Sequence, residues 1–472
     1  MKYQMTEDNG TTQIFRDKIS IVSKEGKRKW IHPRKPKGKL YNLRTWFSVL
    51  LLTILFGTPL IEYDGHPLFL FNFVERKFVL FGFAFVPQDF YLFGLAMISI
   101  IVFVILFTVI FGRLFCGWAC PQTVFLEMVF RKIEYWIEGD AGKQRKLNSD
   151  PWTGSKIVKK FSKWGIFYFI SFLIGNTFLA YIIGIDELKK IVTDNPSNHL
   201  SGLFLILLFT SAFYFVFAYF REYACIYVCP YGRLQGVLLD KNSIVIAYDY
   251  KRGEPRGKIN KAEERTEGDC IDCKMCVDVC PTGIDIRNGT QLECVNCTAC
   301  IDSCNIVMDK INKPRGLIRY DSAVGIETGK KFKVTTREIG YSIVLLVLIA
   351  LQIVLFANRK EIDVTLLRTP GLLFQEQPDG RITNLYNINL ANKTLNEVPI
   401  TLKLKGLDGE IKMIGSDFNL VPAGIIEGKF IVYVARDKIK MMNTPFTVQV
   451  YAGDKLLNEL ESSFNGPITN TK

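Results

Sequence analysis

Eight of the twelve cysteines in this 472-residue chain fall into two copies of one spacing. The first copy reads C-x2-C-x2-C-x3-C-P and contains Cys270, Cys273, Cys276 and Cys280. The second copy has Asn305 where the proline would stand and contains Cys294, Cys297, Cys300 and Cys304. This is the pattern of bacterial ferredoxins that bind two [4Fe–4S] clusters. It therefore predicts two such clusters and one-electron chemistry.

The order of these cysteines also predicts which of them share a cluster. Three closely spaced cysteines can bind three irons of a cubane, and in this pattern the fourth cysteine of each run binds the other cluster. One predicted ligand set is therefore Cys270, Cys273, Cys276 and Cys304. The other is Cys280, Cys294, Cys297 and Cys300. Structural zinc sites are disfavoured, because zinc motifs usually keep two C-x2-C pairs well apart.

Apolar stretches separated by charged segments predict an integral membrane protein. The chain is 22% charged, yet its mean hydropathy is +0.16, and such alternation explains the combination. Spanning helices are expected at 46–61, 90–111, 164–183, 203–220 and 339–356. The first stretch is short and would need tilt or a locally thinner bilayer. The long, charged N-terminus is not typical of a cleavable signal peptide.

The distribution of basic residues predicts the orientation. Lys and Arg are frequent before the first stretch, between the second and third, and between the fourth and fifth, and scarce in the other loops. The positive-inside rule places the basic segments in the cytoplasm and the C-terminus outside, in a multi-pass protein of the bacterial inner membrane. Membrane topology also explains the net charge of +13 without a nucleic-acid partner. Disulfides between the ferredoxin cysteines are disfavoured, because cytoplasmic thiols stay reduced.

Five regions follow from these patterns. They are a basic, flexible N-terminal arm (1–45), a membrane domain with four spanning helices (46–240), a cytoplasmic α+β ferredoxin domain (241–338), a fifth spanning helix (339–356) and a periplasmic domain (357–472). In the last region, apolar and polar residues alternate, for example at 386–390, 400–405 and 446–450. This alternation predicts about seven short strands in an immunoglobulin-like β-sandwich, with a docking or spacer role.

The remaining four cysteines form two C-x3-C-P motifs, each just after an expected spanning helix. They are Cys116 and Cys120, followed by Pro121, and Cys225 and Cys229, followed by Pro230. A phenylalanine lies five residues before each motif, so the two segments resemble an internal repeat. If the spanning helix continued, cysteines four apart would share one face, and the proline would break the helix after them. Thiolates favour Cu(I), zinc or iron–sulfur, so a metal or redox site is preferred over merely buried cysteines.

Other cofactors are not indicated by the sequence. The three histidines, His32, His66 and His199, lie outside the expected spans and are interpreted as surface residues, which disfavours haem held between helices. The chain also has no P-loop and no G-x-G-x-x-G in a βαβ context, so a bound nucleotide is not expected.

With these motifs, the chain resembles the FixG/CcoG family of cytochrome c oxidase accessory proteins over nearly its full length. The segments that carry the resemblance, besides the ferredoxin runs and the β-domain, are 76–78, 87–90, 116–123, 137–140 and 225–233. The resemblance implies a membrane polyferredoxin that reduces Cu(II) to Cu(I) for assembly of a cbb-type oxidase. The implied copper ligands and catalytic residues are Cys116, Cys120, Cys225 and Cys229. The implied partners are oxidase subunits or copper-delivery proteins, together with an electron donor that the sequence does not identify.

Two other functions fit the same motifs. A quinol-oxidising polyferredoxin subunit of an electron-transport chain would share the four spans, the two C-x3-C-P motifs and the two clusters. Such subunits end soon after their clusters, whereas this chain continues into a fifth span and a β-domain. A non-catalytic scaffold for oxidase assembly would use the β-domain and the basic arm for docking.

Overall fold

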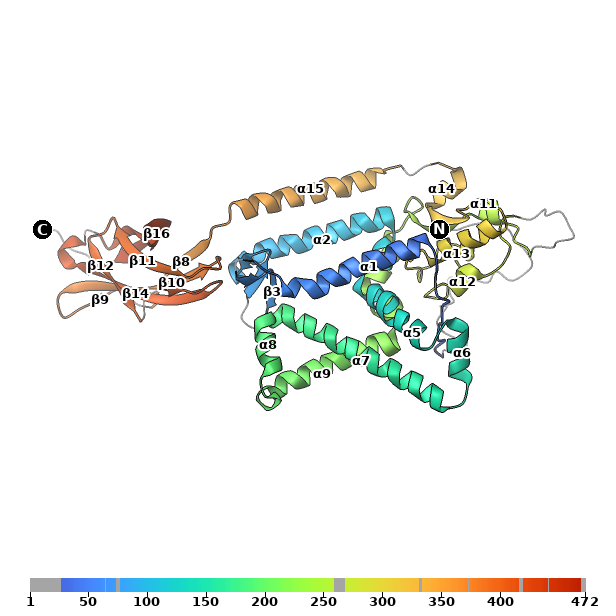
Figure 1. The fold of residues 1–472 in the computed structure, drawn as a ribbon. Coiled ribbons are helices and arrows are strands. Elements are labelled where there is room, and N and C mark those ends of the chain that lie inside the picture. The colour runs from blue at the N-terminus through green and yellow to red at the C-terminus, as the bar shows by residue number, and fades with distance from the viewer. Residues whose placement is uncertain are drawn as a thin grey trace. The chain divides into compact units, whose positions relative to one another are not determined.

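The computed structural model describes residues 27–63, 65–73, 77–258, 268–330, 333–371, 373–415, 419–439 and 441–467 (Figure 1). The chain forms two compact units, each assembled from segments that are distant in the sequence. The first unit comprises Met1–Phe56, Ile98–Thr177 and Asn195–Val347. The second comprises Gly57–Met97, Phe178–Asp194 and Leu348–Lys472.

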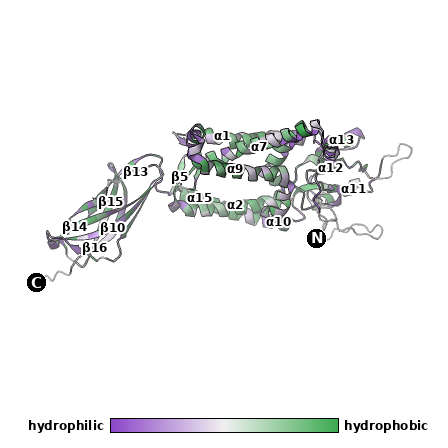
Figure 2. Ribbon diagram, turned by 90° about the horizontal axis from the view of Figure 1, so that it is seen from below, coloured by the Kyte–Doolittle hydropathy of each residue, from purple (hydrophilic) through white to green (hydrophobic). Residues whose placement is uncertain are grey.

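Five helices of the described chain are long and apolar enough to cross a membrane, as the sequence predicts. The candidate spans are Lys39–Leu60, Pro87–Phe111, Gly154–Ile183, Pro196–Phe220 and Thr336–Ala357. Hydrophobic residues follow these helices along their length (Figure 2). The elements that build them are α1 (Lys39–Gly57), η2 (Thr58–Leu60), η3 (Pro87–Asp89), α2 (Phe90–Phe111), α7 (Gly154–Ile183), η5 (Pro196–His199), α9 (Leu200–Phe215), η6 (Val216–Phe220) and α15 (Thr336–Ala357).

The first spanning helix begins earlier than the sequence predicts, at Lys39 instead of residue 46. Its first turns contain charged residues, which hide the start of the helix from a search for apolar residues. Arg44 is only 2% exposed, and its Nε donates to the backbone carbonyl of Gly117 at 2.6 Å. A tertiary partner therefore allows a charged residue to lie inside this helix.

The predicted flexible arm is wrong for residues 27–45. Lys39 and the residues after it are helical. Before the helix, the backbone N–H of Arg34 donates to the carbonyl of Asp278 at 2.8 Å, in the same unit. Residues 1–26 of the predicted arm lie outside the described residues.

Short helices follow the second and fourth spans in the first unit. After α2 come α3 (Leu114–Trp118), α4 (Pro121–Thr123), the π-helix η4 (Val124–Phe130), α5 (Arg131–Ile137) and α6 (Ala141–Ser149). After η6 come the π-helix η7 (Ala224–Val228) and α10 (Pro230–Leu238). The ferredoxin-like lobe follows, with β6 (Val245–Tyr248), α11 (Tyr250–Gly253), α12 (Met275–Asp278), η8 (Ile286–Asn288), α13 (Ala299–Lys310), β7 (Ile318–Asp321) and α14 (Ala323–Thr328). Strands β6 and β7 pair antiparallel and cover an apolar core that includes Ile246, Met308 and Leu317.

The β-domain of the second unit is a two-sheet sandwich, as predicted. One sheet has the order β12-β14-β10-β8, with β9 beside β10, and the other has the order β13-β11-β15-β16. The nine described strands exceed the predicted seven and are β8 (Ile362–Arg368), β9 (Gln375–Glu376), β10 (Arg381–Asn392), β11 (Val398–Lys405), β12 (Gly409–Ile414), β13 (Asn419–Leu420), β14 (Ile425–Ala435), β15 (Asn443–Ala452) and β16 (Lys455–Asn465). The predicted alternation is confirmed, because Tyr386, Ile388, Phe446 and Val448 are all buried between the sheets. The hydroxyl of Tyr386 also donates to the carbonyl of Ser463 on the opposite sheet, at 2.8 Å.

The second unit also contains short elements between the spans. They are β1 (Glu62–Tyr63), β2 (His66–Pro67), β3 (Phe69–Asn72), β4 (Lys77–Leu80), β5 (Phe83–Phe85), α8 (Ile185–Thr193) and, in the β-domain, η9 (Arg436–Lys438). Just before α2, Asp89 is 1% exposed and lies 2.6 Å from both the Arg359 guanidinium and the Lys393 ammonium. This buried triad joins the start of α2, the segment after α15 and the end of β10.

Candidate metal centres

The two ferredoxin runs have the same backbone course. In the first run, Asp272 and Lys274 adopt the left-handed region, with φ of 48° and 57°. In the second run, Asn296 and Thr298 occupy the same two positions, with φ of 54° and 67°. Residues other than glycine rarely adopt these angles, and alternating backbone conformations of this kind aim N–H groups into one concavity. Each run thus forms a tight loop suited to an anionic cluster before a helix begins.

Two cavities in the ferredoxin-like lobe gather the cysteines in the crossed order that the spacing predicts. Cysteines of one cavity are Cys270, Cys273, Cys276 and Cys304. Cysteines of the other are Cys276, Cys280, Cys294, Cys297 and Cys300. Each cavity contains three cysteines of one run and the fourth of the other, and Cys276 lines both cavities. This arrangement fits a pair of cubanes with shared runs.

The continuation of helix α13 explains why the second run has Asn305 and not a proline. Helix α13 continues from Ala299 to Lys310, through Cys304 and Asn305. A proline there would remove a helical hydrogen bond and clash with the preceding turn. The Asn305 carboxamide instead accepts a hydrogen bond from the backbone N–H of Gly316 at 3.0 Å.

Burial sets the protonation of the thiols in this lobe. It raises the pKa of Cys276 and Cys294 to about 12, and that of Cys297 to about 11. Reactive redox cysteines usually have the opposite property, a lowered pKa. These thiols are therefore protonated and weakly nucleophilic in the absence of a metal centre, and binding of a cluster would displace their protons.

The two C-x3-C-P motifs also share one backbone course, which supports the internal repeat. Gly112 and Arg221 both adopt φ near +55°, at 57° and 54°, one residue after the preceding helix ends. The continuous spanning helix considered from the sequence is therefore wrong, since a left-handed residue ends each span before its motif. Cys120 and Cys229 are extended, with ψ of 125° and 111°, because a proline follows each of them.

Side chains of α10, which follows the second motif, reach the first motif. The amide nitrogen of Gln235, on α10, lies 3.3 Å from the sulfur of Cys116. The rings of Tyr231 and Phe115 pack edge-to-face, with centroids 6.3 Å apart. We use the name thiolate tetrad for the set Cys116, Cys120, Cys225 and Cys229.

Electrostatic interactions link the members of the tetrad to one another. Burial raises the pKa of Cys116 to about 11, and the neighbouring Cys120 and Cys229 add to the rise. Burial likewise raises the pKa of Cys225 to about 12, with further contributions from Cys120 and Cys116. Among the described residues, no three His, Cys, Asp or Glu side chains stand close enough together to hold one ion. Side chains of the tetrad would therefore have to move inward to coordinate a single metal ion.

The tetrad is in direct contact with the second predicted cluster site. Cys116 packs against a buried group that contains Val295 and Cys297. Next to it, a Cβ placed on Gly117 would lie 2.5 Å from the Val295 carbonyl oxygen and 2.6 Å from that of Asn296. Only glycine allows the two loops to approach this closely.

A hydrogen-bonded chain reinforces this contact. The indole Nε1 of Trp118 lies 3.3 Å from the hydroxyl of Tyr320, and that hydroxyl donates to the carbonyl of Asn296 at 3.1 Å. Gly117, Gln235 and Tyr320 were not identified from the sequence. Only Gly117 offered a signal, as a glycine within the first C-x3-C-P motif.

A buried network of charges surrounds Arg221, the left-handed residue that precedes the second C-x3-C-P motif. The Arg221 guanidinium donates to both carboxylate oxygens of Glu134, at 2.8 and 2.9 Å, and Arg131 lies 2.5 Å from Glu222. Burial acts to raise the pKa of Glu134, but the charge and hydrogen bonds of Arg221 outweigh it and hold the pKa at about 2. This ion pair fixes Arg221 in a conformation that glycine adopts in the first motif.

The prediction that all three histidines are surface residues outside the spans does not hold for each of them. His32 is half-buried, and its ring nitrogens each lie 3.1 Å from a side chain of α6, Gln144 for one and Asn148 for the other. His66 lies in β2. His199 ends η5, in the first turn of the fourth candidate span, so the prediction that it lies outside the spans is wrong.

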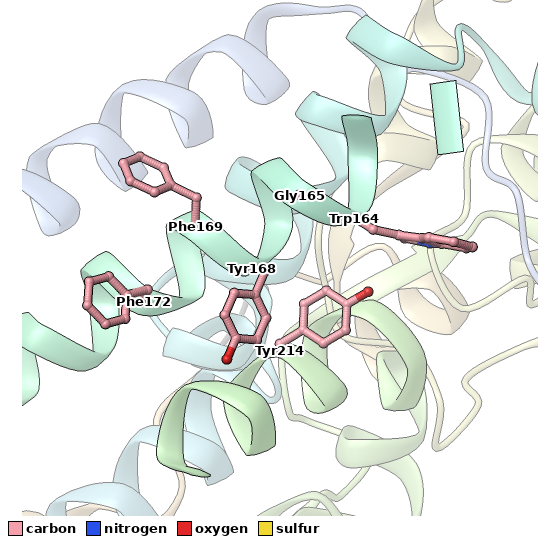
Figure 3. Close-up of a pocket in the computed structure, with 6 residues that line it drawn as sticks. All are labelled: Trp164, Gly165, Tyr168, Phe169, Phe172 and Tyr214. Carbon is pink, nitrogen blue, oxygen red and sulfur yellow. The ribbon is translucent and has the colours of Figure 1, made fainter. Parts of the chain in front are cut away.

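An open groove lies between α7 and α9 (Figure 3). Its lining residues are Trp164, Gly165, Tyr168, Phe169, Phe172 and Tyr214. The rings of Tyr168 and Tyr214 lie 5.7 Å apart, and the Tyr168 hydroxyl is 3.2 Å from that of Ser211. The lining contains no thiol, carboxylate or imidazole, so the groove fits an apolar molecule and not a metal.

Family models match three parts of the chain. A model described as a 4Fe-4S dicluster domain matches residues 220–323, and a 4Fe-4S binding domain matches residues 93–144. A model described as the IG-like fold at the C-terminal of FixG matches residues 352–467. These matches support the iron–sulfur and immunoglobulin-like parts of the predicted fold.

Relatives match most of the chain. Protein RdxB of Cereibacter sphaeroides is 35% identical over 386 residues, which cover 78% of this chain and 80% of that protein. Nitrogen fixation protein FixG of Rhizobium meliloti is 30% identical over 423 residues, which cover 81% and 80%. A crystal structure of a FixG-related protein from Vibrio parahaemolyticus covers 23% of this chain and all of that chain, with 18% identity and a TM-score of 0.21. The chain thus belongs to the FixG family, the family that its motifs resemble, and is a membrane-associated 4Fe-4S electron-transfer protein.

Proposed function

We propose that this protein reduces Cu(II) to Cu(I) at the thiolate tetrad, for assembly of a cbb-type cytochrome oxidase. The observation that carries the proposal is the contact between Cys116 and the group containing Cys297. It joins a set of soft ligands to a predicted cluster site without an intervening segment. When bound, the two [4Fe–4S] clusters supply single electrons.

The residues of the tetrad suit the copper substrate. Thiolates are soft ligands that prefer Cu(I) over harder cations, so they stabilise the product of the reduction. Because burial raises the pKa of Cys116 and Cys225, both thiols carry protons at neutral pH until a metal displaces them. The balanced step is that Cu(II) gains one electron and becomes Cu(I), while the electron donor loses one.

The proposed ligands of the clusters are the two crossed sets, and both clusters lie in the cytoplasm. The basic segments that flank the spans support this orientation through the positive-inside rule. In this orientation the β-domain lies in the periplasm, where it would dock oxidase subunits or copper-delivery proteins. The electron donor would approach the ferredoxin-like lobe from the cytoplasm.

The test is to remove two thiolates of the tetrad and leave the cluster ligands in place. The variant Cys116→Ala/Cys120→Ala is purified without oxygen, its iron is counted, and its clusters are reduced chemically. Stoichiometric Cu(II) is then mixed in, and cluster reoxidation is followed by absorbance and by EPR of the copper. We expect eight irons per chain and a large loss of rate. A wild-type rate in this variant would remove the tetrad from the mechanism.

One observation favours a second occupant of the tetrad, a third [4Fe–4S] cluster. The 4Fe-4S binding domain model spans residues 93–144, where Cys116 and Cys120 are the only cysteines. A cubane needs four thiolates, and Cys225 and Cys229 would provide the other two. Iron analysis separates the occupants, since a third cluster gives about twelve irons per chain and copper binding leaves about eight.

The aromatic groove favours a second function, the oxidation of a membrane quinol. Its ring-lined walls, with the hydroxyls of Tyr168 and Tyr214, fit the head group of a lipid-soluble donor. Adding a short-chain quinol to oxidised, oxygen-free protein tests this function. Rapid bleaching of the cluster absorbance, lost in Tyr168→Ala, would support quinol oxidation over copper reduction.

A further inference from the structure

Gln235 is a buried polar residue that the proposed function has not yet used. It lies on α10 and is 0% exposed. Its amide nitrogen is 3.3 Å from the sulfur of Cys116, and its amide oxygen is 3.5 Å from the same atom. Burying an amide is costly unless hydrogen bonds compensate it. The sulfur of Cys116 is therefore a principal partner of this side chain.

The internal repeat shows that the fold of the motif does not require an amide here. Gln235 lies six residues after Cys229, and the residue six positions after Cys120 is Leu126. Leu126 is also buried, at 4% exposure. A leucine thus fills the equivalent position in the first motif, so the polar group in the second motif serves something other than packing.

A hydrogen-bonded chain holds the amide in place. The Tyr231 hydroxyl lies 2.8 Å from the hydroxyl of Thr108 and also hydrogen-bonds to Gln235. Tyr231 lies one turn before Gln235 on α10, so the same helix positions both side chains. The amide therefore keeps a fixed orientation towards Cys116.

The amide acts on the thiolate that faces the cluster site. Cys116 packs against the group that contains Cys297. An N–H group aimed at a sulfur stabilises the negative charge that the sulfur shares with its metal. The reduced state of a metal–thiolate centre carries one more negative charge than the oxidised state. A fixed donor in a buried site therefore favours the reduced state.

We propose that Gln235 is a positioning residue of the thiolate tetrad, whose amide N–H donates to the Cys116 thiolate and raises the reduction potential of the metal held there. This inference rests on the proposed function, because it assumes a metal at the tetrad. The hydrogen bond makes the tetrad a better electron acceptor than the thiolates alone would be.

The test compares Gln235→Leu with wild-type full-length protein, purified in detergent without oxygen and loaded with one equivalent of copper. Leucine is the residue that the first motif already holds at this position, so we expect the variant to fold. The measurement is a redox titration that follows the copper by EPR, with the signals of the two clusters as internal references. Without the N–H donor, we expect the ratio of Cu(I) to Cu(II) at a fixed solution potential to fall at least tenfold, about 59 mV for one electron.

A matched control distinguishes the hydrogen bond from a general loss of packing. Gln144 is another buried glutamine, at 2% exposure, and it bonds to the Gly139 carbonyl and to His32. We expect Gln144→Leu to leave the copper potential unchanged. An unchanged potential in Gln235→Leu, or an equal shift in Gln144→Leu, would overturn the inference.

The same experiment separates this inference from the proposed function. Wild-type protein with no metal at the tetrad would overturn both. If the tetrad instead holds iron, the copper proposal fails, and the potential of that iron centre in Gln235→Leu decides the inference by the same criterion.

Discussion

Replacing Gly117 by alanine tests the contact that connects the tetrad to the ferredoxin-like lobe. The new Cβ would lie 2.5 Å from the Val295 carbonyl oxygen and 2.6 Å from that of Asn296. The closest ordinary carbon–oxygen contacts are about 3.3 Å, so the two backbones must separate by about 0.8 Å. Neither partner can move aside by rotating a side chain, because both are backbone atoms. The separation therefore moves Cys116 away from Cys297.

The expected cost of this substitution is moderate. Overpacking of this kind destabilises a protein by about 1–3 kcal/mol. Gly117 has helical geometry in α3, so alanine regains up to about 1 kcal/mol of helix propensity. The net loss is therefore at most about 3 kcal/mol, which leaves the protein folded. The larger effect falls on electron transfer across the contact, because the tetrad and the cluster site are pushed apart.

The assay is rapid mixing of reduced, oxygen-free protein with stoichiometric Cu(II), followed through cluster absorbance. Gly117→Ala should keep its eight irons and reoxidise more slowly than wild type. Gly142 provides the control, since it lies in α6 and a Cβ there meets nothing within 4 Å. Gly142→Ala should match the wild-type rate. A Gly117→Ala variant with both wild-type stability and wild-type rate would refute the argument from the close contact.

Three further predictions concern buried charges. Arg221→Gly keeps the left-handed backbone but removes the two hydrogen bonds to Glu134 and leaves it only the longer ion pair with Lys163, at 3.6 Å, so thermal unfolding in detergent should show a loss of about 3–5 kcal/mol, partly restored in Arg221→Gly/Glu134→Gln. The pKa of Glu134 is about 2 in the folded protein, below its ordinary 4.5, so its stabilising contribution is complete above pH 4.5 and is lost as the pH falls towards 2. Denaturant unfolding at pH 6 and pH 3.5 should show this loss in wild type and a smaller one in Glu134→Gln. Asp89→Asn leaves Arg359 and Lys393 without their shared carboxylate, so hydrogen exchange should become faster at the end of β10, and an unchanged exchange rate there would contradict a structural role of the triad.

Cysteine spacing carries the prediction of the cluster sites because ligand geometry is encoded locally. Three cysteines at x2 spacing can wrap one cluster without any knowledge of distant contacts. The crossed position of Cys304 also follows from the pattern, and the cavity that it lines agrees with it. The lengths of the apolar stretches predicted the five spans for a similar reason, since a helix needs about 20 apolar residues to cross a bilayer.

Features that depend on tertiary partners were not predicted. Helix α1 starts at Lys39, where the Asp302 carboxylate accepts hydrogen bonds from the backbone N–H groups of Leu40 and Tyr41, at 3.3 and 2.8 Å, and this partner is more than 260 residues away in the sequence. The break at Arg221 was missed because an arginine does not signal a left-handed backbone. Glu134 compensates that conformation from another helix. Comparison with Gly112 in the repeat was the one sequence signal that could have revealed it.

The two C-x3-C-P motifs differ in ways that make the surroundings of the tetrad asymmetric. Both motifs end their spans with a left-handed residue and extend the cysteine before the proline, so the repeat alone predicts a symmetric site. Two asymmetric features fall on Cys116: the contact with the group that contains Cys297 and the amide of Gln235. At the sequence position equivalent to Gln235, the first motif has Leu126, which offers no hydrogen-bond donor. An electron that enters a symmetric site has no preferred ligand, whereas here the thiol that packs against the group containing Cys297 is also the one that, in our proposal, the Gln235 amide stabilises in the reduced state.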